Sequence, residues 1–226
     1  MTNNVRKIDI QILPDYTKGE EIFNTITHIL GGIMAIVMIV LGVIKGATLH
    51  NPWIIVTGSI YGFFVFLMFT ISSLYHGLLP GTGKKVLRII DHCDIYLCIA
   101  GTYTPILLVA IRPLYSATAW IIFGIEWGLA TLGVILNAID MDKFEKTSFI
   151  IYLAMGWCIV FSLSKAVSAM TFSGFLWLLA GGIAFSLGAA FYLIDSKIRY
   201  MHSIFHIFVD VGVLLQFFSI FFFVFR

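Results

Sequence analysis

Long apolar runs separated by short polar connections dominate the chain. A helix needs about 20 apolar residues to cross the hydrocarbon core of a membrane, where its backbone N–H and C=O groups must be paired without water. Runs of that length recur along the sequence, and the connections between them carry most of the charge. The pattern predicts seven transmembrane helices, over residues 22–44, 52–78, 86–110, 116–138, 147–168, 174–194 and 201–225.

The composition agrees with this pattern. Of the 226 residues, 60% are hydrophobic and only 12% are charged, whereas a soluble domain has about 25% charged residues. No soluble domain fits between the apolar runs, so the sequence predicts an all-α integral membrane protein. We expect one seven-helix bundle that uses the whole chain, residues 1–226, with Pro105 kinking the third span.

A polar tail, residues 1–20, precedes the first apolar run. The run is too long for the core of a signal peptide, and no small-residue cleavage pattern follows it. We therefore expect this run to remain in the protein as its first span.

Lysine and arginine gather at one side of the predicted spans, which gives the helices an orientation. Basic residues concentrate on the cytoplasmic side of membrane proteins. The side of the N-terminus carries ten of them: Arg6, Lys7, Lys18, Lys84, Lys85, Arg88, Lys143, Lys146, Lys197 and Arg199. The other side carries four: Lys45, Arg112, Lys165 and Arg226. We expect the N-terminus in the cytoplasm, the C-terminus outside, and the protein in the plasma (inner) membrane.

Net charge and cysteine content point to no further partner. A net charge of +2 is too small to indicate nucleic acid, and the basic residues already have a role in topology. The three cysteines, Cys93, Cys98 and Cys158, lie inside predicted helices without a CxxC pair. We expect them to be buried as small hydrophobic residues.

Polar residues from three predicted spans fall at one depth. Ser72 and His76 lie near the cytoplasmic end of the second span, four residues apart and so on one face. Asp91 lies near the start of the third span. His202 and His206 lie in the first two turns of the seventh span. Ionisable groups are costly at membrane depth, so their convergence suggests a shared metal ion.

Zinc suits this set of residues. It binds neutral imidazole nitrogens, prefers four ligands, and in catalytic sites leaves one position for water. The ligands would be His76, His202 and His206, while Asp91 either binds directly or holds the water, and Ser72 donates a hydrogen bond to it. The alternative is that these histidines only form hydrogen bonds between helices.

An ordered set of motifs runs along nearly the whole chain: Glu21-x-x-Asn24-x-x-Thr27-His28, Ser72-x-x-x-His76, Arg88-Ile89-Ile90-Asp91-His92, Ala100-Gly101-Thr102-Tyr103-Thr104-Pro105, Met155-Gly156-Trp157 and His202-x-x-x-His206. Together these motifs resemble those of the bacterial haemolysin III proteins, the prokaryotic branch of the progestin and adipoQ receptor superfamily.

This resemblance implies a seven-helix bundle with a cytoplasmic N-terminus. It also implies zinc on His76, His202 and His206, with Asp91 and Ser72 beside the ion and a water between. Four positions depart from the usual pattern of the family: Asp94, Glu126, Asp210 and Gln216. These departures concern the surrounding polar residues more than the ligands.

A fourth histidine, His28, shares a helical face with Glu21 and Asn24 on the cytoplasmic side. The three residues either support the ligands and orient substrate or form hydrogen bonds between helices. His92 follows Asp91 but points about 100° away on a helix, so we leave it out of the ligand set.

Three functions follow from the sequence. The first is a zinc-dependent hydrolase of a membrane lipid amide or ester, with Asp91 as general base and Ser72 steadying the developing charge; some superfamily members have been proposed to cleave ceramide. The second is a lipid sensor in which zinc is structural. Both fit a role in membrane-lipid homeostasis. The third is a pore-forming haemolysin, which the uniformly apolar spans support least.

Overall fold

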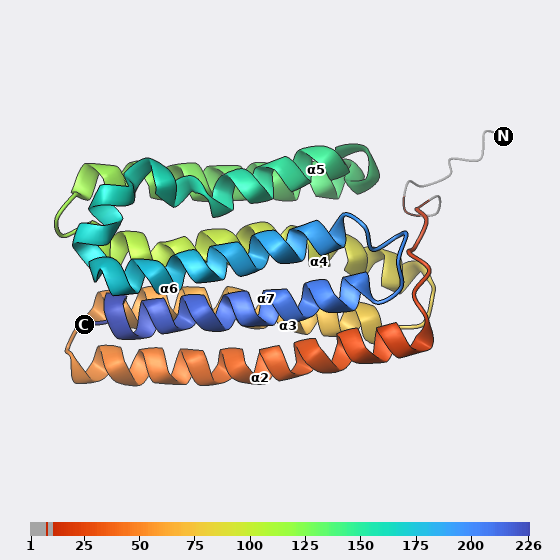
Figure 1. The fold of residues 1–226 in the computed structure, drawn as a ribbon, viewed down its shortest axis with the longest axis horizontal. Helices are drawn as coiled ribbons and strands as arrows, with labels where there is room; N and C mark the ends of the chain where they lie inside the picture. Colours follow the sequence, from red (N-terminus) through yellow and green to blue (C-terminus); the bar gives the residue numbers. More distant parts are fainter. Residues whose placement is uncertain (1–7, 9–10) are drawn as a thin grey trace.

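The computed structural model describes residue 8 and residues 11–226, and over these residues it contains helices and no strand (Figure 1). Arg6, Lys7 and Asp9 of the predicted polar tail lie outside the described residues. In chain order the helices are α2 (Lys18–Thr48), α3 (Pro52–Gly77), α4 (Thr82–Pro105), η1 (Ile106–Ile111), α5 (Ser116–Gly156), η2 (Cys158–Ser162), α6 (Leu163–Tyr192), α7 (Met201–Ser219) and η3 (Ile220–Val224).

Large apolar side chains cover the outside of the bundle. Along α2 the exposed ones recur every three or four residues, at Ile22, Ile26, Ile29, Ile33, Val37, Val40 and Ile44. The opposite face of α2 is buried and includes Gly31, Ala35 and Met38. A helix at a water-facing surface carries polar residues on its outer side. The apolar exterior therefore agrees with a protein that lies in a membrane.

Five helical stretches of the described chain are long and apolar enough to cross a membrane: Lys18–Thr48, Pro52–Gly77, Thr82–Ile111, Ser116–Tyr192 and Met201–Val224. The fourth of these has 77 residues, far more than one crossing needs. Its backbone is non-helical at Asp140 (φ −167°, ψ 87°) and at Thr171 (φ 68°, ψ 160°). Figure 1 shows the chain reversing direction within α5. Both breaks fall between spans that the sequence predicts.

The predicted span 147–168 is not one continuous helix, because α5 ends at Gly156 and a short 3-10 helix, η2, follows it. The Tyr103 side chain of α4 forms hydrogen bonds with backbone groups on both sides of this break. Its hydroxyl donates to the Gly156 carbonyl at 3.1 Å and accepts from the Ile159 N–H at 2.9 Å. A non-helical backbone is stable at membrane depth only where such partners exist.

Pro105 ends α4, and the chain continues as a π-helix, η1. Proline has no N–H and its ring clashes with the carbonyl four residues earlier, so the regular hydrogen-bond pattern cannot pass through it. The Arg112 N–H accordingly donates to the Leu107 carbonyl, five residues back, at 2.8 Å. The structure therefore shows a change of helix type after Pro105, and the kink expected there stays a prediction.

The helices pack mainly in chain order: α2 contacts α3, α3 contacts α4, α4 contacts α5, and α6 contacts α7. Contacts between α2 and α7 close the bundle. Because of this closure, the first and last long helices lie together, with the C-terminal end of α3 beside them. The three cysteines are buried and free, as expected.

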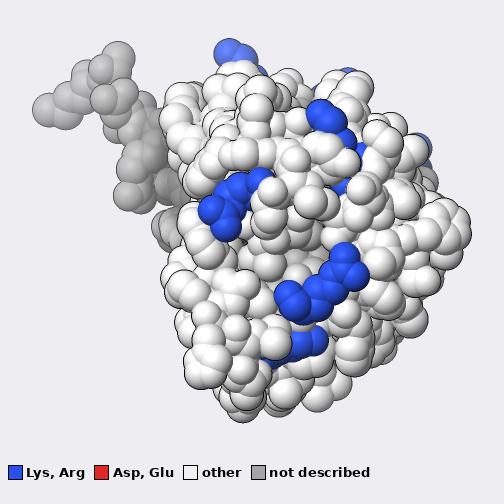
Figure 2. All heavy atoms as spheres, turned by 90° about the vertical axis from the view of Figure 1, so that its left-hand side faces the viewer, with Lys and Arg blue, Asp and Glu red and all other residues white. Residues whose placement is uncertain are grey.

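The end of the bundle that holds the C-terminus carries basic side chains. α2 begins at one end, and the C-terminus lies at the other (Figure 1). Lys and Arg side chains are scattered over the end that holds the C-terminus, and no acidic side chain is visible there (Figure 2). Lys45 and Arg226 are held at this end by backbone carbonyls, those of Phe221 and Ala169, at 2.7 and 2.8 Å.

Candidate metal centre

Two helix ends bring the predicted histidines to the same end of the bundle. His76 is the next-to-last residue of α3, and α7 begins at Met201, just before His202. Tyr200, which precedes α7, has a left-handed backbone (φ 63°, ψ 4°), and its N–H donates to Glu20 Oε1 at 2.6 Å. This bond to α2 fixes the point at which α7 starts.

His76, His202 and His206 come together as the sequence predicts. One nitrogen of each ring lies within 4.8 Å of the others. The ring centroid of His76 lies 5.2 Å from that of His202 and 4.9 Å from that of His206. All three residues are buried, with exposed fractions of 2%, 7% and 1%. We call these three residues the histidine trio.

The trio fits a metal ion because it leaves buried nitrogens without hydrogen bonds. Neither His76 Nε2 nor His206 Nδ1 has a partner in the described part of the chain. A buried polar atom without a partner is unfavourable, and neutral imidazole nitrogens are preferred ligands of zinc and similar ions. A cation among the three rings would satisfy these atoms.

Carboxylates contact two of the three rings at Nδ1. Glu21 Oε2 lies 2.6 Å from His76 Nδ1, and Asp195 Oδ2 lies 2.8 Å from His202 Nδ1. A carboxylate at Nδ1 makes that nitrogen the proton donor, which leaves Nε2 free to bind a metal. Glu21 is itself held by Lys84, whose Nζ lies 2.6 Å from Glu21 Oε1.

Asn24 and His28, predicted with Glu21 to support the ligands, also lie beside the trio. Asn24 Oδ1 accepts a hydrogen bond from Ser203 at 2.7 Å, and its Nδ2 lies 3.5 Å from His76 Nδ1. The ring of His28 stacks on that of His206, with centroids 3.7 Å apart. Neither nitrogen of His28 has a hydrogen-bond partner among the described residues. Their role toward the ligands stays a prediction.

Asp91 and Ser72 are not part of the trio. The ligand-type group of the described chain consists of the three histidines alone, without Asp91. The Asp91 carboxyl interacts with the Ser72 side chain, and both residues line a cavity that His202 and His206 also line. His92, excluded from the ligand set by its direction, likewise lies outside the trio.

Two cavities meet at this site. One, of about 540 Å³, runs inside the bundle past Thr102 and Ile106 and has mostly apolar walls. The other, of about 550 Å³, lies at the end of the bundle and is lined by polar residues such as Tyr16, Glu20 and Arg199. Residues that line both are Arg88, Asp91, His92, Glu145, Tyr192, Leu193 and His202. The region around Asp91 and His202 therefore faces an apolar chamber on one side and a polar one on the other.

Three residues of the site were not predicted: Lys84, Asp195 and Tyr16. The sequence interpretation counted Lys84 only as a charge at the cytoplasmic face, yet its exposed fraction is 4%. Asp195 lies only seven residues before His202. This short spacing was the signal in the sequence that a carboxylate could lie beside that histidine. Tyr16 lies in the polar tail, and no local pattern connects it to the histidines.

The unusual acidic residues Asp94, Glu126 and Asp210 lie outside the trio. Each has at least one buried carboxylate oxygen without a hydrogen-bond partner in the described chain. Gln216 lines the apolar cavity, and a Cβ on Gly181 would lie 2.5 Å from its Cγ atom.

Comparison with known proteins gives matches over most of the chain. The family model described as "Haemolysin-III related" matches residues 16–217. "Hemolysin-3" of Bacillus cereus is 38% identical over 205 residues, which cover 91% of this chain and 92% of the relative. "Hemolysin-3 homolog" of Bacillus subtilis (strain 168) is 36% identical over 208 residues, covering 92% and 96%. "Monocyte to macrophage differentiation factor" of Homo sapiens is 30% identical over 202 residues, covering 84% and 81%.

Proposed function

Because the chain belongs to the Haemolysin-III related family, we propose that it is a zinc-binding membrane protein that hydrolyses a membrane lipid. The fold supports this proposal through the histidine trio and the cavity beside it. The proposal includes seven crossings, a cytoplasmic N-terminus, a place in the plasma membrane and a role in membrane-lipid homeostasis. The backbone breaks at Asp140 and Thr171 support the seven crossings, because they divide the 77-residue stretch. The start of α2 and the C-terminus lie at opposite ends of the bundle (Figure 1), as an odd number of crossings requires.

Zinc fits the trio by its chemistry. Three imidazole ligands leave a fourth position for water or substrate. When bound in this way, zinc lowers the pKa of water toward neutrality and polarises a carbonyl group. Asp91 lies outside the ligand group, which supports a reactive site more than a site closed by a fourth protein ligand.

The protein residues around the trio have distinct tasks in this proposal. Asp91 accepts the proton of the attacking water as general base. Ser72, which lies within reach of Asp91, donates its hydroxyl to the negative charge that develops on the substrate oxygen. Water adds across the amide or ester bond, so the products are a carboxylic acid and an amine or alcohol.

The observation that carries the proposal is the apolar cavity that Ser72, Asp91, His202 and His206 all line. Its volume of about 540 Å³ is in the range of small-molecule sites. An acyl chain in this chamber would place its carbonyl group next to the trio and Asp91. A lipid amide or ester is therefore the substrate class that we propose.

The test is a hydrolysis assay with purified, zinc-loaded protein and lipid amides and esters, in which release of fatty acid is measured. We expect turnover by the native protein and none by Asp91→Ala, which keeps bound zinc. Zinc-free protein serves as the control for background hydrolysis. Turnover by Asp91→Ala would exclude Asp91 from the mechanism, and no turnover of any lipid by the zinc-loaded protein would contradict the hydrolase.

A second candidate is a lipid sensor with structural zinc. The trio joins α3 to α7, and Glu21 of α2 and Lys84 of α4 are bound to the same cluster. A metal at this position would tie four helices together, and a lipid in the chamber would shift them. Zinc-loaded protein that binds lipid in a saturable manner without hydrolysing it would favour the sensor over the enzyme.

The name of the Bacillus cereus relative supports a third candidate, a haemolysin. Lysis of red blood cells by the purified protein tests this directly. If lysis is a property of the folded metal protein, it should be lost in the variant His202→Ala/His206→Ala. Equal lysis by an unrelated membrane protein at the same concentration would mean that lysis is a general effect of membrane insertion.

A further inference from the structure

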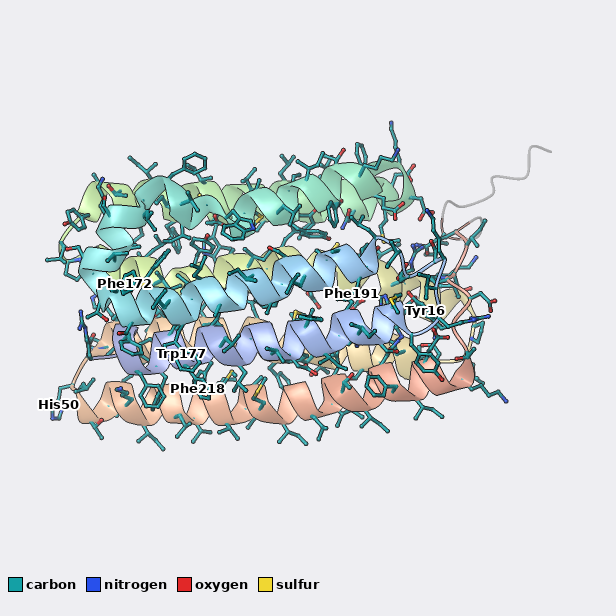
Figure 3. The ribbon with its side chains drawn as sticks, viewed as in Figure 1. Tyr16, His50, Phe172, Trp177, Phe191 and Phe218 are labelled. Carbon is teal, nitrogen blue, oxygen red and sulfur yellow. The ribbon has the colours of Figure 1, made fainter. Side chains whose placement is uncertain are left out.

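The chain segment before α2, residues 11–16, lies at the end of the bundle beside the trio. We call it the cover segment. Arg88 of α4 donates to the Ile12 carbonyl at 3.2 Å, and Arg199, in the connection between α6 and α7, donates to the Asp15 carbonyl at 2.6 Å. Two arginines from different parts of the fold thus hold the segment in place. Figure 3 shows Tyr16, its last residue, at the end of the bundle where α7 begins.

Tyr16 contacts the trio from this segment. Its ring centroid lies 4.8 Å from that of His202 and 5.8 Å from that of His76. Its hydroxyl donates to Asp195 Oδ2 at 3.0 Å. The same oxygen lies 2.8 Å from His202 Nδ1. Tyr16, Asp195 and His202 therefore form a continuous chain of hydrogen bonds that ends at a predicted metal ligand.

Asp195 needs such a partner more than Glu21 does. Glu21 lies on a regular helix, α2, and is held by Lys84. Asp195 lies beyond the end of α6 in a connection of turns. Here the hydrogen bond from Tyr16 holds the Asp195 carboxylate, and that carboxylate in turn orients His202. Lys84 and Tyr16 thus have equivalent places in the two carboxylate–histidine pairs.

The Tyr16 hydroxyl is suited to be a permanent donor. Burial and the neighbouring Asp195 carboxylate both raise its pKa above the usual value for tyrosine. The phenol donates to Asp195 Oδ2, the same oxygen that faces His202 Nδ1.

We propose that Tyr16 is a positioning residue of the metal centre, which holds Asp195 against His202 and so raises the affinity of the trio for a transition metal. The proposal rests on the proposed metal site, and it makes the cover segment part of that site. Loss of partners behind a metal-binding histidine typically weakens metal binding by about 10- to 100-fold. Tyr16 acts one bond further away, so we expect an effect at the lower end, about tenfold.

The experiment is a double-mutant cycle on the full-length protein in detergent. Metal affinity is measured for Tyr16→Phe, Asp195→Asn and the double variant by competition for zinc with a chromophoric chelator. Tyr16→Phe keeps the ring and removes only the hydroxyl. If Tyr16 acts through Asp195, Tyr16→Phe weakens binding about tenfold, and the double variant binds no more weakly than Asp195→Asn. Tyr115→Phe, which removes a phenol that contacts Ser168, is the matched control and should bind like the native protein.

A second readout reports on geometry rather than affinity. The visible absorption spectrum of the cobalt-substituted protein depends on how the ligands surround the ion, and we expect Tyr16→Phe, but not Tyr115→Phe, to change it. Native zinc affinity of Tyr16→Phe would overturn the proposal, and so would effects of Tyr16→Phe and Asp195→Asn that multiply in the double variant. Native protein that binds no metal would instead refute the metal site itself.

Discussion

At the scale of single residues, two of the three histidines of the site are paired with carboxylates. His76 and His202 each have a carboxylate at Nδ1, and each carboxylate has its own donor. His206 differs, because it has the ring of His28 stacked against it instead. The paired histidines have their orientation set before a metal binds, which lowers the cost of forming the site.

Glu126 of α5, in contrast to the carboxylates of the site, is buried without a strong hydrogen-bond donor, and this allows a prediction. It has no exposed surface, and neither of its carboxylate oxygens has a hydrogen-bond partner in the described chain beyond the Cys158 thiol. A buried polar group without a good partner costs about 1–3 kcal/mol. Glu126→Leu should therefore raise the thermal unfolding midpoint in detergent, whereas Glu126→Gln, which keeps polar atoms there, should not. A less stable Glu126→Leu would show that the carboxyl group has a favourable partner.

At the scale of helices, the position of α7 depends on its contact with α6. A Cβ atom added to Gly181 would lie 2.9 Å from the backbone carbonyl oxygen of Gly212. Backbone cannot yield as a flexible side chain does, so the two helices approach this closely only with glycine at that place. The same helix, α7, carries His202 and His206, so this packing contributes to the site at a distance.

Gly181 and its neighbour Gly182 form a matched pair for testing this contact. Gly181→Ala should destabilise the protein by about 1–3 kcal/mol through overpacking. A Cβ on Gly182 would meet nothing within 4 Å, so Gly182→Ala should be neutral or slightly stabilising, since alanine favours helix. Thermal unfolding of the two variants measures the difference. Equal stability of both would contradict the close packing of α6 on α7.

The helices could be predicted from the sequence largely because hydropathy reports which segments avoid water. The same property explains why the break inside the predicted span 147–168 was missed. The break after Gly156 lies among apolar residues, and what stabilises it is the Tyr103 hydroxyl of another helix. Asp195 and Tyr16 were missed for a similar reason. Each reaches the trio through a connection rather than a helix, so no periodicity places it there.

At the scale of the whole molecule, closure of the bundle makes the site. The trio needs the end of α3 beside the start of α7, and the contacts of α2 with both helices bring this about. The resulting site lies at one end of the molecule, where an apolar chamber and a polar cavity meet. In the proposed function, the apolar chamber would receive the lipid and the polar cavity would supply water.

The proposed orientation of the bundle can be tested with an impermeant thiol reagent on intact cells. His50 and Tyr16 lie at opposite ends of the molecule (Figure 3), and His50 and Lys143 are both exposed. In a background without Cys93, Cys98 and Cys158, His50→Cys should be labelled from outside. Lys143→Cys should be labelled only after the cells are opened. The reverse pattern would mean that the N-terminus lies outside.

The most direct test of the central claim is the transition-metal content of the purified protein. The close approach of His76, His202 and His206 predicts one zinc ion per chain, measured by elemental analysis. It also predicts loss of that ion and a lower unfolding temperature in His202→Ala/His206→Ala, since metal binding energy adds to folding energy. His50→Asn, which changes an exposed histidine, should keep the metal. Well-folded native protein without metal, or full metal content in the double variant, would contradict the account.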